Sequence, residues 1–221
     1  MEYINCTESD ILEIIHICNY LSECSIIDSK YLDQIILIKS NNLINDNNRY
    51  CPQNGFIDIS DYPQLNARVI SPINIEDKYI IIIKKEILES IASLHTVAHE
   101  IIHVIDMIEY SKVHGVYYYF HTEECQREHY FHEFMFWTEF HAKRVGTFVY
   151  AIKGYEIFND GIPPEDGVYT LESVDYQTSL LEKIIEEQPK NDISEISDWI
   201  NKCLLEFSSY LGRLSIFDNG E

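Results

Sequence analysis

The stretch KYIIIIKKEILESIASLHTVAHEIIHVID, residues 78–106, decides the fold. Its first part, 78–85, places consecutive isoleucines between charged residues, which is typical of a buried strand. The apolar residues that follow predict a long helix, which begins near Glu86 or Ser90 and ends near Ser111. A short strand that leads into a long, buried helix is therefore expected.

Within this predicted helix, residues 99–103 read HEIIH. Two histidines four positions apart project from nearly the same face of a helix and can bind one zinc ion. The glutamate between them can act as general base on a water molecule beside the metal. We therefore predict Zn²⁺ as the cofactor, His99 and His103 as metal ligands, and Glu100 as the catalytic residue.

A third metal ligand has to come from another part of the chain, because a catalytic zinc ion has three protein ligands and one open position. The metzincin pattern, with a third histidine six residues after His103, is absent. At about 100° per residue, Glu139 shares a helix face with His132 and with the small residues Ala142 and Gly146, which would let two helices approach closely. We predict Glu139 as the third ligand, with His132 as the alternative.

Other polar residues are candidates for supporting roles. His95 lies on the same face as the motif, and we expect it to cap the helix or to lie outside the ligand shell. Asp106 returns to that face three residues after His103 and can accept the other ring N–H of a ligand histidine. The candidates for stabilising an oxyanion are Tyr117, Tyr118, Tyr119, His121 and His132.

The remaining elements are predicted from apolar periodicity and turn residues. In chain order they are helices over 8–24 (Thr7 or Ser9 as N-cap) and about 29–40, an Asn-rich loop over 41–56, strands over 56–60 and 66–71, a loop or short strand after Gly115, a helix from about Thr122 to Ala151, and helices over about 171–187 and 193–217. This order predicts an α+β fold. The predicted domains are 1–152, with its N-terminal helices, and a C-terminal helical region, 169–221, that packs on the same domain after a linker, 153–168.

Two segments resemble the ImmA/IrrE-like group of zinc metallopeptidases. Residues 96–103, TVAHEIIH, are similar to the T-x-A-H-E-x-x-H core of that group, and residues 137–142, WTEFHA, to its downstream E-x-x-A helix. The resemblance is distant: Ile102 stands where a glycine is frequent. It implies a zincin-like fold, with a small sheet packed on the active-site helix. The helices predicted at both ends of the chain are additional to this fold. It also implies a phage or mobile-element origin and a protein or peptide substrate, such as a regulator.

Composition narrows the possible partners and location. The chain has 221 residues, 46% of them hydrophobic, which is enough for one sizeable core. Its formal charge of −21 argues against binding to nucleic acid. The six scattered cysteines form no C-x-x-C pair, which argues against a cysteine-based zinc site. Because no apolar run reaches a membrane span of about 18 residues and no secretory signal starts the chain, we expect no membrane partner and a cytoplasmic location.

Three hypotheses follow for the function. The first is a zinc metalloendopeptidase that binds its peptide substrate by strand addition along 66–71 or 78–84. The alternative is a catalytically inactive, zinc-containing module that binds another protein. In the third, the HExxH sequence arose by chance in a helical protein without metal.

Overall fold

The fold is that of a computed structural model, which describes residues 1–51, 65–116, 120, 122–158, 172–187 and 193–217. The chain divides into two compact units, Met1–Phe131 and His132–Glu221. The first unit contains a four-stranded sheet with helices, and the second is helical in its described part. The predicted α+β class is confirmed, whereas the predicted domain borders at 152 and 169 stay predictions.

The sheet of the first unit has the strand order β1-β2-β4-β3. Strands β1 (Glu2–Ile4), β2 (Ile35–Ser40) and β4 (Tyr79–Lys84) run parallel, and β3 (Ala67–Ile70) pairs antiparallel with β4. The predicted strands at 78–85 and 66–71 are thereby confirmed, and β1 was not predicted. Because β2 and β4 have a neighbour on both sides, β1 and β3 form the edges of the described sheet.

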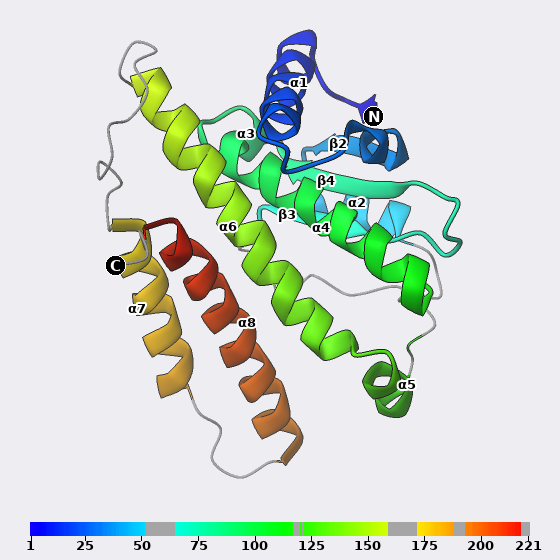
Figure 1. Ribbon diagram of the computed structural model, residues 1–221, viewed down its shortest axis with the longest axis vertical. Helices are drawn as coiled ribbons and strands as arrows, with labels where there is room; N and C mark the ends of the chain where they lie inside the picture. The colour runs from blue at the N-terminus through cyan, green and yellow to red at the C-terminus, as the bar shows by residue number, and fades with distance from the viewer. Residues whose placement is uncertain (52–64, 117–119, 121, 159–171, 188–192, 218–221) are drawn as a thin grey trace. The chain divides into compact units, whose positions relative to one another are not determined.

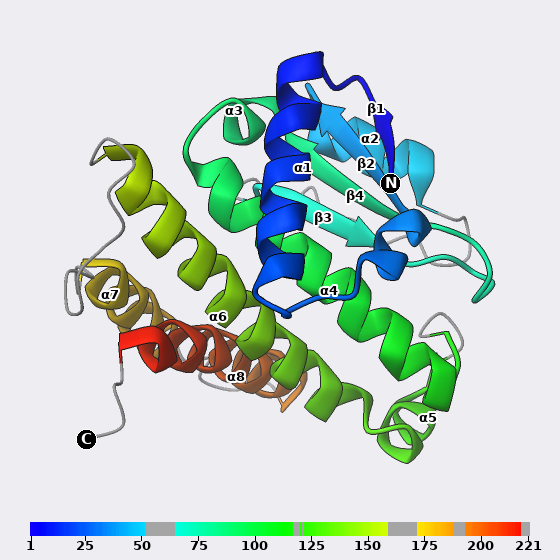
Figure 2. The same ribbon diagram turned by 45° about the horizontal axis from the view of Figure 1, so that its top comes forward.

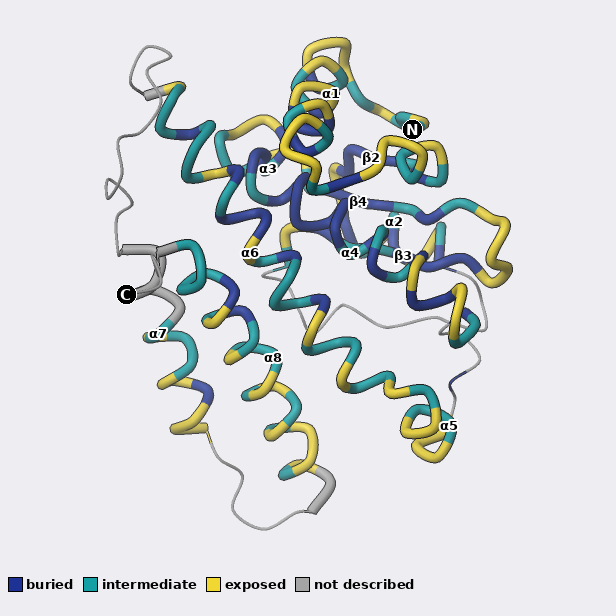
Figure 3. Tube along the Cα trace, viewed as in Figure 1, coloured by how far each residue is buried: buried dark blue, intermediate teal, exposed yellow. Residues whose placement is uncertain are grey.

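Helices cover both faces of this sheet (Figures 1 and 2). Helices α1 (Glu8–Glu23) and α4 (Ala92–His114) lie together on one face, where the hydroxyl groups of Tyr79 and Ser111 are 3.4 Å apart. Helix α2 (Leu43–Tyr50) packs on the other face and joins an apolar cluster with alternate residues of β2, β3 and β4. Figure 3 shows the strands and much of α4 as buried, so the sheet forms the core of this unit.

Two predictions for the N-terminal part of the first unit were wrong. The expected helix over 29–40 is a 3-10 helix, η1 (Ser29–Gln34), followed by β2. The apolar residues of β2 are buried between two neighbouring strands, and this pairing outweighs the helical spacing of the segment. The expected loop over 41–56 contains α2, which begins after Asn42 because the Asn42 side chain accepts a hydrogen bond from the Asn45 backbone N–H.

The single helix expected over 122–151 is also wrong. Thr122 is an N-cap as predicted, but the helix that it begins, α5 (Glu123–Glu128), is only six residues long. Tyr130 then adopts a positive φ of 53°, which a helix interior does not allow, and α6 begins at Phe131. Helix α6 continues to Phe158, so the first six residues of the predicted linker over 153–168 are helical. Its remainder and the predicted strand over 56–60 lie outside the described residues.

The two C-terminal helices are confirmed in the second unit. They are α7 (Glu172–Glu186) and α8 (Ile193–Phe217), which pack against each other. The indole N–H of Trp199 on α8 donates a hydrogen bond of 2.7 Å to the backbone carbonyl of Ile184 on α7. Across the described residues, none of the helices has the length and apolar character needed to cross a membrane.

A buried ion cluster fixes α1 to the sheet. The Lys39 ammonium lies 2.8 Å from Asp10 and 2.6 Å from Glu89, and its side chain is 7% exposed. Burial alone would raise the pKa of Asp10, but hydrogen bonds from Lys39 and Thr7 hold that pKa below its ordinary value. Because the depressed pKa belongs to the folded state, this stabilisation is present above about pH 3.9, the ordinary aspartate value, and is lost as the pH falls through the folded-state pKa.

We expect Lys39→Met to lower the free energy of unfolding at pH 7 by about 3–5 kcal/mol, because it leaves Asp10 buried without its cation. Urea denaturation at pH 7 measures this change. Lys30→Met is the matched control, since the Lys30 pair with Asp28 is exposed and such pairs contribute little. A Lys39 variant as stable as the Lys30 variant would show that the cluster does not hold α1 in place.

Candidate metal centre

The helix that carries the HExxH motif is the most buried helix of the first unit. Helix α4 follows the short helix α3 (Lys85–Leu88) and packs on β3 and β4. Its first turn has no side-chain cap, and the Ser93 hydroxyl instead donates a hydrogen bond to the Glu13 carboxylate of α1. The motif lies in the middle of this helix, where the backbone hydrogen bonds on both sides hold its residues in register.

The two predicted histidine ligands converge as the sequence spacing requires. The Nε2 atoms of His99 and His103 are 3.0 Å apart, and their rings meet edge to face at an angle of 85°. His99 is buried and His103 is half-buried. The two Nε2 atoms therefore point to one place beside α4.

This separation fits a metal ion. In a tetrahedral site with Zn–N bonds of about 2.0–2.1 Å, two imidazole nitrogens lie about 3.3 Å apart. The distance of 3.0 Å between the two Nε2 atoms is close to that value. The same distance also fits a direct hydrogen bond, in which one imidazole N–H donates to the other ring. Analysis of the metal content of the purified protein distinguishes a bound metal ion from this hydrogen bond.

The remaining α4 residues of the prediction lie on the same helix. Glu100 and Asp106 are buried. The ring of His95 stacks on that of His99 with centroids 5.4 Å apart and an angle of 22° between the planes. This stacking was not predicted from the sequence, and it places the His95 ring against the His99 imidazole. The predicted pairing of Asp106 with a ligand histidine stays a prediction.

The predicted third ligand, Glu139, belongs to α6 in the second unit. There its Oε1 atom accepts a hydrogen bond of 2.5 Å from the hydroxyl of Ser209 on α8. Burial raises the pKa of the neighbouring Glu206, and the Glu139 charge raises it further, whereas Lys143 lowers it. Glu139 thus lies in a polar, partly buried environment with a defined hydrogen-bond donor.

The other candidates are distributed between the units or fall outside the described residues. His132 lies at the start of α6, in the second unit. Residues 117–119 and 121, which include most of the candidate oxyanion donors, lie outside the described part of the chain. The choice among these donors therefore stays open.

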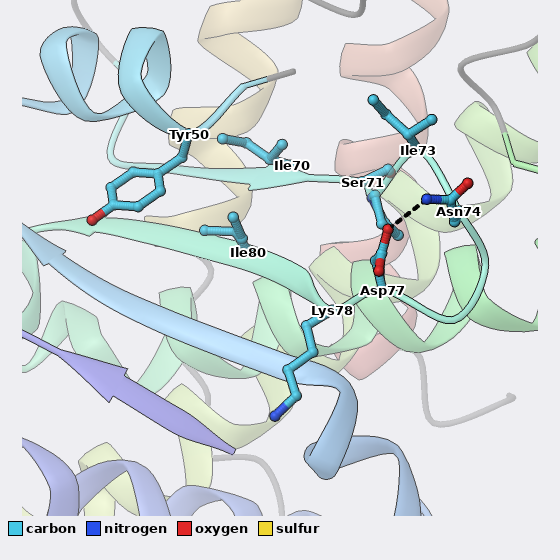
Figure 4. Close-up of a pocket in the computed structure, with 9 residues that line it drawn as sticks. Tyr50, Ile70, Ser71, Ile73, Asn74, Asp77, Lys78 and Ile80 are labelled. Atoms are coloured by element: carbon cyan, nitrogen blue, oxygen red, sulfur yellow. Dashed lines mark hydrogen bonds between the residues drawn. The ribbon is translucent and has the colours of Figure 1, made fainter.

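A small open pocket of about 230 Å³ lies elsewhere in the first unit (Figure 4). It is formed where β3 ends and β4 begins, and its rim is held by a hydrogen bond of 2.8 Å from the Asn74 amide to the Asp77 carboxylate. None of the predicted site residues lines it. This pocket is therefore separate from the histidine pair.

Comparisons with protein-family models, with curated proteins and with solved structures found no match for this chain. The case for a function therefore depends on the chemistry of the residues described above.

Proposed function

We propose that the protein is a zinc metalloendopeptidase in which His99, His103 and Glu139 bind the metal. The observation that carries the proposal is the convergence of the two Nε2 atoms, 3.0 Å apart, on a buried helix that also holds Glu100. Glu139 would supply the third donor, and two histidines with one carboxylate are residue types that could hold a metal ion. Two histidines and a glutamate are the donor set of thermolysin-like zinc peptidases.

The number of donors favours a catalytic over a structural ion. The proposed ligand set, taken from the described residues, has three donors, whereas structural zinc sites have four protein ligands. A bound zinc ion would lower the pKa of a coordinated water to about 7 and polarise the scissile carbonyl. The resemblance of 96–103 and 137–142 to ImmA/IrrE-like peptidases supports the same assignment, including a zincin-like arrangement of the fold and action in the cytoplasm.

Glu100 is the proposed general base. Its carboxylate takes a proton from the attacking water and passes it to the leaving amine of the peptide. Its place between the two histidines in the sequence puts it to the side of their common face, which is where this role requires it. Its side chain is buried, with 8% of the residue exposed, so the carboxylate is largely shielded from bulk water.

The edge strand β3 is the proposed binding place for the peptide. Of the two segments predicted for strand addition, β4 has neighbours on both sides, whereas β3 pairs with β4 alone among the described strands. Helix α4 packs along β3, and the Ser71 hydroxyl just after the strand contacts the Met107 sulfur at 3.3 Å. A peptide added at β3 would therefore run beside the helix that carries the histidines.

The proposal is tested on the purified chain by metal analysis together with a proteolysis assay on an unfolded protein such as casein. We expect about one zinc ion per chain and cleavage that a chelator abolishes and added zinc restores. Zinc without cleavage would favour the inactive protein-binding module. Stoichiometric iron, which also accepts two histidines and a carboxylate, or the absence of any metal from metal-replete protein, would contradict the proposal.

A further inference from the structure

We propose that Ser209 is a positioning residue for the metal ligand Glu139, so that the C-terminal helix α8 forms part of the metal centre. This inference rests on the proposed function. Its basis is the hydrogen bond of 2.5 Å from the Ser209 hydroxyl to Glu139 Oε1. The two residues are 70 positions apart in the sequence, and no motif connects them.

The Ser209 hydroxyl is a hydrogen-bond donor that burial and close helix packing hold in one position. Ser209 is 5% exposed, so its hydroxyl group is withheld from competing water. One turn later on α8, Gly212 brings the two helix backbones together: a Cβ at Gly212 would lie 2.5 Å from the carbonyl oxygen of Phe140 and 3.1 Å from the Lys143 Cβ. The close approach of the α8 backbone at Gly212 to the α6 backbone at Phe140 keeps Ser209 next to Glu139.

A carboxylate can accept the Ser209 hydrogen bond and bind a metal ion at the same time. A carboxylate offers about four lone-pair sites, so one hydrogen bond leaves capacity for a metal ion. Hydrogen bonds from neighbouring residues to a metal-binding side chain fix the orientation of that side chain. Their removal typically lowers metal affinity by about 10–100-fold. The same helix offers a comparison, because the hydroxyl of Ser208 instead donates to the backbone carbonyl of Leu204 at 2.9 Å.

The experiment measures zinc affinity by competition with a chromophoric chelator, and the visible spectrum of the cobalt-substituted protein, for the full chain. We expect Ser209→Ala to weaken zinc binding by about 10–100-fold and to shift the cobalt spectrum. Ser208→Ala should leave both unchanged. Ser209→Thr should bind more tightly than Ser209→Val, because these two side chains have the same shape and differ in the hydroxyl group.

The outcomes separate the inference from the proposed function. If the wild type binds zinc and Ser209→Ala binds it equally well, the positioning role is wrong while the metal centre stands. Equal losses in Ser208→Ala and Ser209→Ala would mean that α8 contributes only general stability, which also overturns the inference. If Ser209→Ala does not fold, the Thr and Val pair decides, since equal affinities would remove any role for the hydroxyl. Absence of zinc from the wild type would refute the proposed function itself.

Discussion

Glu100→Gln is expected to abolish most of the peptidase activity while one zinc ion per chain is retained. The amide has nearly the shape of the carboxylate but cannot accept the proton of the attacking water. General acid–base catalysis contributes about 10²–10⁴-fold to such reactions, so kcat/KM should fall by at least about 100-fold. Initial rates on a fluorogenic peptide, with zinc content measured on the same samples, check the prediction.

The control for this prediction is Glu109→Gln, on the same helix. Glu109 is exposed and pairs with Lys112, so its substitution removes a charge without touching the motif. It should retain wild-type activity. Undiminished proteolysis by Glu100→Gln would remove Glu100 from the mechanism, even if the metal site itself were correct.

Glu139→Ala is expected to reduce zinc affinity by more than about 100-fold, because the loss of a direct ligand should exceed the loss of an outer hydrogen-bond partner. Activity should fall in parallel, since the two histidines alone would hold the ion weakly. Competition with a chelator of known affinity provides the measurement.

Glu133→Ala is the matched control for Glu139→Ala. Glu133 is exposed near the start of the same helix, α6, and is not in the proposed ligand group. Zinc affinity should therefore stay at the wild-type value. If Glu139→Ala bound zinc as tightly as Glu133→Ala, the third ligand would have to be sought elsewhere, first at His132.

The sequence alone predicts those features of the structure that are determined by residues close together in the chain. The isoleucines of 80–83 predict β4 because a short β-branched run between charged residues has few other stable solutions. The convergence of His99 and His103 follows from helix geometry alone, since residues four apart share a face. The N-cap at Thr122 likewise depends only on neighbouring residues, because the Thr122 side chain accepts a hydrogen bond from the Cys125 backbone N–H.

Prediction failed where the outcome depends on distant partners. The apolar run of 35–38 fits a helix or a strand, and the parallel neighbours β1 and β4 decide for a strand. Helix α2 has few apolar residues, so its Asn-rich sequence resembles a loop until Leu43 packs on the sheet. The donation from Ser209 to Glu139 is beyond any local pattern, because it exists only when α8 packs on α6.

The most direct test of the central claim is the position of the zinc ion in a crystal of the zinc-loaded protein, located by anomalous scattering at the zinc edge. We predict one peak at about 2.0–2.2 Å from His99 Nε2, His103 Nε2 and a carboxylate oxygen of Glu139, with a water molecule in the fourth position. A peak away from the two histidines, or one with a fourth protein ligand in place of the water, would contradict a catalytic zinc centre at HEIIH.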